Sequence, residues 1–216
     1  MAEQEGVLKF QLRYKRSGPI EKSFISELNA WRTVLFRLNL IGQDPSRYGG
    51  FGFGNISRRM PPFRCDTPEQ IRFIITGTQT GSLETLSPKQ YTTVTGATLS
   101  ENCVSAEGPV EPSSEALTHA AVYAADNGLR FIFHVHCPQI WQRSSALALP
   151  FTDPDIPYGT VEMARAVTRL IKDHKTRKSL IFSMLGHEDG IVSFGRSAEE
   201  AGCILVHSLA RALAVD

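Results

Sequence analysis

Two histidines, His134 and His136, stand one residue apart at the end of the apolar run FIFHVH. In a β-strand alternate side chains project from one face, so Ile132, His134 and His136 should point the same way. Two imidazoles on one face can reach a single ion at the zinc–nitrogen distance of about 2.0–2.1 Å. A simpler interpretation is a half-exposed pair at a strand end, because zinc takes three or four ligands.

A metal site here therefore needs further ligands from elsewhere in the chain. His187 lies in the polar turn LGHEDG, where a loop can present a side chain to a site, and it is the preferred third ligand. His119 follows Glu115 by four residues on one face of a predicted helix and is the second choice; Glu115 itself offers a carboxylate oxygen. His174, at a charged helix end, and His207, in the last helix, are expected outside the site.

Helices and strands alternate around these residues. Apolar periodicity and helix start signals predict helices over residues 21–40, 112–128, 138–147, 160–175 and 197–213, the last with Ser197 as N-cap and Glu200 three positions on. Short apolar runs ended by glycine or by a polar turn predict strands over residues 72–77, 91–96, 102–108 and 129–136, with two more within 179–195. The segment YGGFGFGNISRR, residues 48–59, is expected to be a glycine-rich turn. This order predicts a layered α/β or α+β domain.

Composition sets the broad class of protein. The chain has 216 residues, 42% of them hydrophobic, which is enough for a sizeable core in one domain. The formal net charge of +1 gives no electrostatic reason to expect nucleic acid or an anionic membrane as a partner. Apolar runs stay well short of the ~18 residues of a transmembrane helix, and the polar start MAEQEGVLKF is unlike a signal peptide. The four cysteines are widely spaced, which fits a reducing compartment, so we expect a cytoplasmic protein.

Taken together, several segments resemble the class II aldolase/adducin family. They occur in the family's order at residues 52–57 (GFGNIS), 76–81 (TGTQTG), 108–123 (GPVEPSSEALTHAAVY), 131–136 (FIFHVH), 156–164 (IPYGTVEMA) and 186–201 (GHEDGIVSFGRSAEEA). The resemblance implies a three-layer α/β/α domain with a central, mostly antiparallel sheet. We assign that domain to residues 21–216, after an N-terminal extension of residues 1–20. The resemblance also implies one divalent metal ion per chain, most often zinc, and a homo-oligomer, with a tetramer favoured.

Carried over residue by residue, the resemblance assigns roles to nine positions. It makes His134, His136 and His187 the metal ligands and Glu115 the catalytic acid/base. It implies that a substrate phosphate is bound by Asn55, Thr80, Gly81, Ser113 and Ser114. The serines precede a predicted helix, where free backbone N–H groups and the helix dipole attract an anion. Ordinary N-capping would also place serines there.

The sequence departs from the family pattern at several places, two of which bear directly on the site. It has no tyrosine after Tyr158, whereas aldolase members place a proton donor near the C-terminus. His187 is followed by Glu188 and Asp189 where the family usually has glycine. We expect a metal-dependent aldolase or related lyase that acts on a small hydroxy-carbonyl compound, expected to be a sugar phosphate, through a metal-stabilised enediolate. An epimerase or dehydratase on the same scaffold and a non-catalytic adducin-like interaction module are the alternatives.

Overall fold

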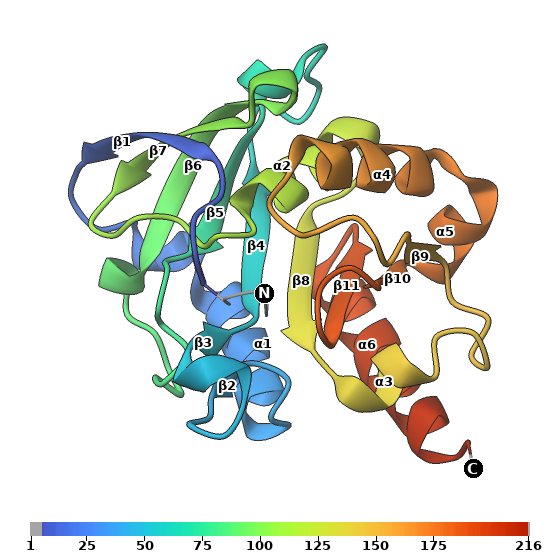
Figure 1. Cartoon of the computed structure of the whole chain (residues 1–216). Helices are drawn as coiled ribbons and strands as arrows, with labels where there is room; N and C mark the ends of the chain where they lie inside the picture. The colour runs from blue at the N-terminus through green and yellow to red at the C-terminus, as the bar shows by residue number, and fades with distance from the viewer. Residues whose placement is uncertain (1–5, 216) are drawn as a thin grey trace.

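The computed structural model describes residues 6–215, and nine of their strands form one sheet in the order β1-β7-β6-β5-β4-β8-β11-β10-β9 (Figure 1). The strands are β1 (Gln11–Arg16), β4 (Asn55–Met60), β5 (Arg72–Thr76), β6 (Tyr91–Thr98), β7 (Cys103–Gly108), β8 (Phe131–His136), β9 (Phe151–Thr152), β10 (Ile181–Met184) and β11 (Gly190–Gly195). The edge pairs β1–β7 and β9–β10 are parallel, and the pairs between them are antiparallel. A separate small ribbon pairs β2 (Gly42–Gln43) with β3 (Gly52–Phe53).

Helices cover both faces of this sheet. They are α1 (Ser26–Arg37), α2 (Ala116–Ala125), α3 (Pro138–Gln142), α4 (Val161–Lys172), α5 (His174–Ser179) and α6 (Ala198–Leu213). The apolar core on one face contains side chains of α2 and α4, and the core on the other face contains those of α1, α3 and α6 (Figure 1). The three-layer α/β/α fold with a mostly antiparallel sheet, predicted from the sequence, is therefore confirmed.

Helix boundaries follow local capping. Ser197 Oγ accepts a hydrogen bond from the Glu200 backbone N–H at 3.0 Å, so the predicted N-cap of α6 is present; such a cap is typically worth ~1 kcal/mol. The helix predicted over residues 160–175 is instead divided. Asp173 ends α4 in an extended conformation, and its carboxylate accepts from the Lys175 N–H at 2.8 Å to start α5.

Several strands lie where the sequence did not predict them, among them β4 and β1. Residues 55–59 belong to the predicted glycine-rich turn, but the structure places them in β4, which pairs with β5 and β8 in the middle of the sheet. Gly54, at φ 75°, turns the chain into this strand, and a Cβ there would lie 3.2 Å from the backbone oxygen of His134. The glycines therefore permit a close approach of two strands. Strand β1 lies within residues 1–20, the segment assigned to an extension, and adds an edge to the sheet.

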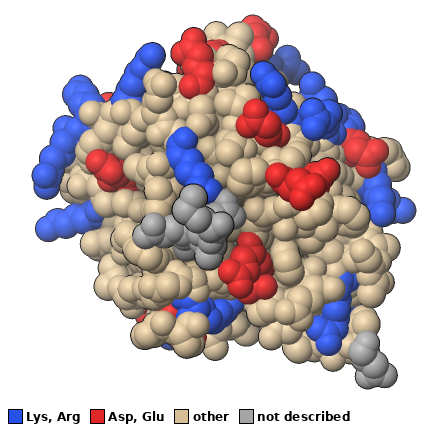
Figure 2. Space-filling view, viewed as in Figure 1, with Lys and Arg blue, Asp and Glu red and all other residues tan. Residues whose placement is uncertain are grey.

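The charge distribution on the surface and the length and polarity of the helices bear on whether nucleic acid or a membrane is a partner. Basic side chains lie mostly toward the rim of the face in view, acidic ones stand also nearer its centre, and uncharged residues occupy most of it (Figure 2). Among residues 6–215, every helix is too short or too polar to cross a bilayer.

Candidate metal centre

Strand β8 carries His134 and His136 on the sheet face that is covered by α2. Ile132, two residues before His134, belongs to the core shared with α2, whereas the alternating residues of β8 belong to the core on the opposite face. The predicted division of the strand into two faces is therefore correct. Both histidines have an exposed fraction of 0%, so a pair of half-exposed side chains is excluded.

The turn between β10 and β11 brings His187 to the same place. Hydrogen bonds from His187 N–H to Met184 O at 3.0 Å and from Gly190 N–H to His187 O at 2.9 Å close this turn. One ring nitrogen from each of His134, His136 and His187 lies within 4.8 Å of the other two. This spacing suits three nitrogen ligands around one ion with a further position open to substrate, as in catalytic zinc sites.

The protonation state of the two strand histidines also suits metal binding. Burial, and next the neighbouring charge of His187, hold the pKa values of His134 and His136 well below the usual 6.5. His134 Nδ1 lies 3.2 Å from the carbonyl oxygen of Ile191, so a proton on Nδ1 is donated there. Its Nε2 has no hydrogen-bond partner among the described residues and keeps a free lone pair. Such a carbonyl contact fixes ring orientation and tautomer for a metal ligand.

Glu115 adds a carboxylate beside the three rings. It occupies the N-cap position of α2, and its exposed fraction is 1%. Its Oε1 lies 3.7 Å from His187 Nδ1. A buried carboxylate is costly unless a positive group compensates it, and either a protonated imidazole or a divalent cation would do so. The donor set of three imidazoles and one carboxylate therefore fits a divalent ion.

Two tyrosines that the sequence pattern did not single out form walls of this site. The ring of Tyr158 stacks on that of His187 with centroids 4.3 Å apart, and the ring of Tyr48 meets that of His136 edge-on at 4.6 Å. The Tyr48 hydroxyl donates to the Asp189 carboxylate at 2.6 Å. Burial, and next this hydrogen bond, raise the pKa of Tyr48, so its hydroxyl stays protonated. These contacts join distant segments, and no local spacing would have indicated them.

A polar pocket adjoins the histidines. All five residues that the sequence analysis assigned to phosphate binding line it, and the described lining is Gly6, Gly52, Gly54, Asn55, Gly77, Thr78, Gln79, Thr80, Gly81, Ser113 and Ser114. Asn55 pairs directly with His134 across β4 and β8, and Ser114 precedes Glu115, so the pocket and the histidine cluster are neighbours. The buried Oδ1 of Asn55 has no hydrogen-bond partner among the described residues.

The other histidines lie apart from the cluster of ligating atoms. His119, the second choice as third ligand, is buried on α2 with its Nδ1 2.7 Å from Ser57 Oγ, and it is not a member of the described three-histidine group. His174 on α5 and His207 on α6 are exposed. The structure therefore groups His187 rather than His119 with the two strand histidines.

Comparisons with known proteins bear on the family and the fold of the chain. The family model described as Class II Aldolase and Adducin N-terminal domain matches residues 46–213. Among solved structures, YgbL from Klebsiella pneumoniae is 18% identical, with a TM-score of 0.63 over 90% of this chain and 88% of that one. L-fuculose-1-phosphate aldolase from Thermus thermophilus is 19% identical, with a TM-score of 0.63 over 90% and 93%. Sugar-phosphate aldolase from Thermotoga maritima is 16% identical, with a TM-score of 0.61 over 89% and 93%.

The extent of these matches decides what they establish. None of the curated proteins compared matches the chain. At 16–19% identity the solved structures establish the shared fold, whereas the family model extends over most of the sequence. The chain therefore belongs to the class II aldolase/adducin family.

Proposed function

We propose that this protein is a metal-dependent lyase of the aldolase type, which cleaves a carbon–carbon bond in a small phosphorylated hydroxy-carbonyl compound. The observation that carries this proposal is the cluster of three buried imidazoles with a buried carboxylate beside it. Burying four groups of this kind is costly for a domain that only binds other proteins. The site therefore favours an enzyme over a non-catalytic adducin-like module.

In this proposal His134, His136 and His187 hold one divalent ion, with zinc preferred. The ion would supply Lewis-acid stabilisation of the negative charge that develops on a substrate's carbonyl oxygen. Glu115 lies beside one of these imidazoles, His187, and the polar pocket adjoins another, His134. Because the three rings are buried, bulk water is kept away from the reacting atoms, which strengthens electrostatic interactions there.

Glu115 is the proposed proton-transfer group. Its carboxylate is buried within 3.7 Å of His187 and belongs to the residue that directly precedes α2. A carboxylate in this position can take a proton from a substrate hydroxyl or carbon next to the polarised carbonyl and can return it later. Proton transfer by a positioned side chain typically contributes ~10²–10⁴ in rate. In the reverse direction the same group would assist formation of the carbon–carbon bond.

The pocket beside Asn55 is the proposed phosphate site. Its glycines let the surrounding segments pack closely around it. Ser113 and Ser114 lie just before a helix whose dipole favours an anion. Asn55 lines this pocket and pairs with His134, so its orphan oxygen is available to substrate atoms beside the histidines. A substrate with a phosphate a few atoms from its carbonyl would reach both parts of the site.

The experiment that tests this function compares the wild type with Glu115→Gln on a panel of sugar phosphates. Glutamine keeps the size of the side chain and removes the basic oxygen. We expect wild-type protein loaded with zinc to release a carbonyl fragment, and the variant to retain the metal but to lose cleavage and exchange of the substrate proton with deuterated water. Isomeric sugar products without fragments would favour an epimerase, and dehydrated products a dehydratase. No turnover by the wild type across the panel would contradict the lyase proposal.

The homotetramer and the cytoplasmic location that were expected from the sequence remain predictions. Light scattering coupled to size-exclusion chromatography would measure the first, and a mass other than that of four chains would contradict it.

A further inference from the structure

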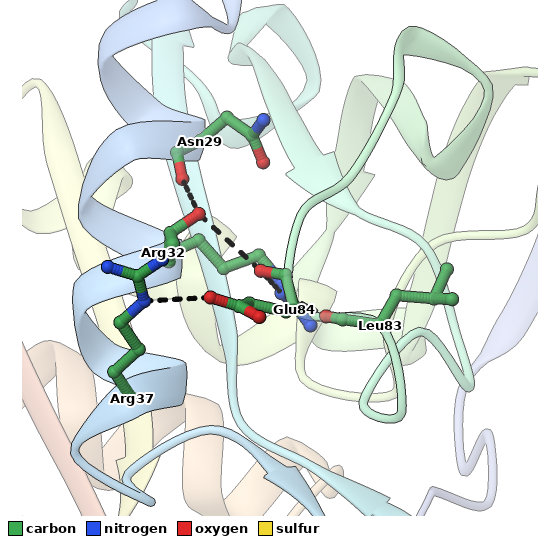
Figure 3. Close-up of polar contacts among 6 residues, drawn as sticks. Asn29, Arg32, Arg37, Leu83 and Glu84 are labelled. Atoms are coloured by element: carbon green, nitrogen blue, oxygen red, sulfur yellow. Dashed lines mark hydrogen bonds and ion pairs between the residues drawn. The ribbon is translucent and has the colours of Figure 1, made fainter.

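A buried arginine on α1 holds the loop that forms one side of the polar pocket. Arg32 has an exposed fraction of 1%. Its guanidinium donates to the backbone carbonyl oxygens of Leu83 and of Glu84, the latter at 2.9 Å (Figure 3). It also donates to the carbonyl oxygen of Thr80 at 2.9 Å. Three hydrogen bonds from one rigid fork fix the path of this loop relative to α1.

The charge of Arg32 has no anionic partner in the described part of the chain. Arg32 contacts the backbone of Glu84, but the Glu84 carboxylate pairs with Arg37 Nε at 2.7 Å on the exposed side of α1 (Figure 3). Burial lowers the pKa of Arg32, but an arginine side chain stays protonated in proteins. A buried cation without a counter-ion destabilises the fold, so stability alone does not explain why Arg32 is charged and buried here.

The carbonyl of Thr80 belongs to the same peptide plane as the N–H of Gly81. In a planar trans peptide these two groups point in opposite directions. Because Arg32 holds the Thr80 oxygen toward α1, the Gly81 N–H is directed away from α1. Gly81 and Gly52 both line the polar pocket. If Gly52 had a Cβ atom, that atom would lie 3.1 Å from the Gly81 nitrogen. Among the described residues no acceptor takes the Gly81 N–H.

The lining of the pocket explains what this arrangement can do. None of the described lining residues has a charged side chain. A bound anion would meet neutral donors in front and, directly behind the Thr80–Gly81 peptide, the positive charge of Arg32. Charges interact more strongly across a poorly hydrated interior than through water.

We infer that Arg32 is a positioning residue for the anion pocket: it directs the Gly81 N–H into the pocket and supplies from behind the positive charge that the lining lacks. This inference rests on the proposed phosphate site. It assigns the anion affinity of that site in part to a residue that does not touch the ligand.

The test is a titration of inorganic phosphate into the zinc-loaded protein and four variants. Arg32→Gln removes the charge and the fork, and we expect phosphate to bind about ten- to hundredfold more weakly, the range that a hydrogen bond to a charged group represents. Arg32→Lys keeps the charge without the fork, so it should restore part of the affinity. Zinc affinity, measured by competition with a chelator, should stay unchanged, because Arg32 does not contact the histidines.

Two variants on the same helix control for a merely structural effect. Arg37→Gln breaks an exposed ion pair to the same loop, and Asn29→Ala removes the amide that bonds the backbone of Leu86 at 2.9 and 3.1 Å. Both loosen the loop away from the Thr80–Gly81 peptide, and both should bind phosphate nearly as the wild type does. Equal weakening by Asn29→Ala and Arg32→Gln would overturn the inference, since loop anchoring alone would then explain the effect.

Other outcomes separate this inference from the proposed function. Wild-type protein that binds no phosphate would reject the phosphate site and the inference together. Wild-type protein that binds phosphate while Arg32→Gln binds it equally well would reject the inference alone. If Arg32→Gln does not fold, the amide signal of Gly81 in labelled wild-type protein decides: it should shift strongly as phosphate saturates the pocket. A stationary Gly81 signal at saturation would overturn the proposed role.

Discussion

His119 should make the protein lose stability as the pH falls below neutral. Its side chain is fully buried on α2, its Nδ1 lies 2.7 Å from Ser57 Oγ, and that hydroxyl lies 2.9 Å from the hydroxyl of Tyr123. Burial lowers the pKa of His119 from 6.5 to about 3 in the folded protein. Between about pH 3 and pH 6.5 the imidazole is therefore neutral in the folded chain and charged in the unfolded chain.

The sign and size of the effect follow from proton linkage. Between the unfolded pKa of 6.5 and the folded pKa of about 3, the unfolded chain binds a proton that the folded chain does not. The free energy of unfolding therefore falls with the pH in this window, and the loss reaches about 2 kcal/mol at pH 5. Above neutral pH, His119 is uncharged in both states and has no such effect.

The assay is urea unfolding at pH 7.5 and pH 5.0 for the wild type, His119→Gln and His174→Gln. On moving to pH 5.0, the wild type should lose about 2 kcal/mol more stability than His119→Gln loses, because contributions from the other histidines cancel in the comparison. His174→Gln removes an exposed histidine and controls for the loss of an imidazole as such. Equal losses in the wild type and His119→Gln would refute the reasoning, since they would mean that folded His119 accepts a proton readily.

Three further substitutions test the packing around the site. Gly81→Ala would place a Cβ 2.2 Å from the backbone oxygen of Gly42, so the loop must move. Phosphate titration should then show binding at least about tenfold weaker, with the zinc content unchanged. Unaltered phosphate binding would contradict the close approach of Gly81 to Gly42. Gly202→Ala would place a Cβ 2.2 Å from the ring of Trp31. Overpacking should destabilise the fold by ~1–3 kcal/mol, which outweighs the gain in helix propensity, so the melting temperature should fall. A higher melting temperature would contradict this. Tyr48→Phe removes the hydrogen bond to Asp189 and should lower the free energy of unfolding by ~1 kcal/mol in urea; no loss would mean that water replaces the hydroxyl.

Periodicity in the sequence predicted the elements whose structure is determined locally. The alternation in β8 correctly placed His134 and His136 on one face, and the apolar spacing of α4 matches its buried residues. The strand β4 was not predicted, because its glycine-rich start resembles a turn and its partner β8 lies far away in the chain. Pairing between distant strands is set by tertiary structure and is weakly encoded in a local window.

The site was predictable only where a family motif or residue chemistry marked it. The histidines and Glu115 were candidates because their side chains are typical metal ligands and proton carriers. Arg32 gave no such signal, because its partners are backbone carbonyls, which look alike in every sequence. Tyr48 and Asp189 are far apart in the chain and meet only when the loop before β3 folds against the turn before β11.

The most direct test of the proposed metal centre is the zinc content of the wild type, His187→Ala and His119→Gln after zinc loading and dialysis. The wild type should hold about one ion per chain, in keeping with three protein ligands and one open position. His187→Ala should lose the ion, because only His134 and His136 remain as nitrogen ligands in the described cluster. His119→Gln should keep it. Full zinc content in His187→Ala, or its loss in His119→Gln, would contradict the assignment of the metal centre.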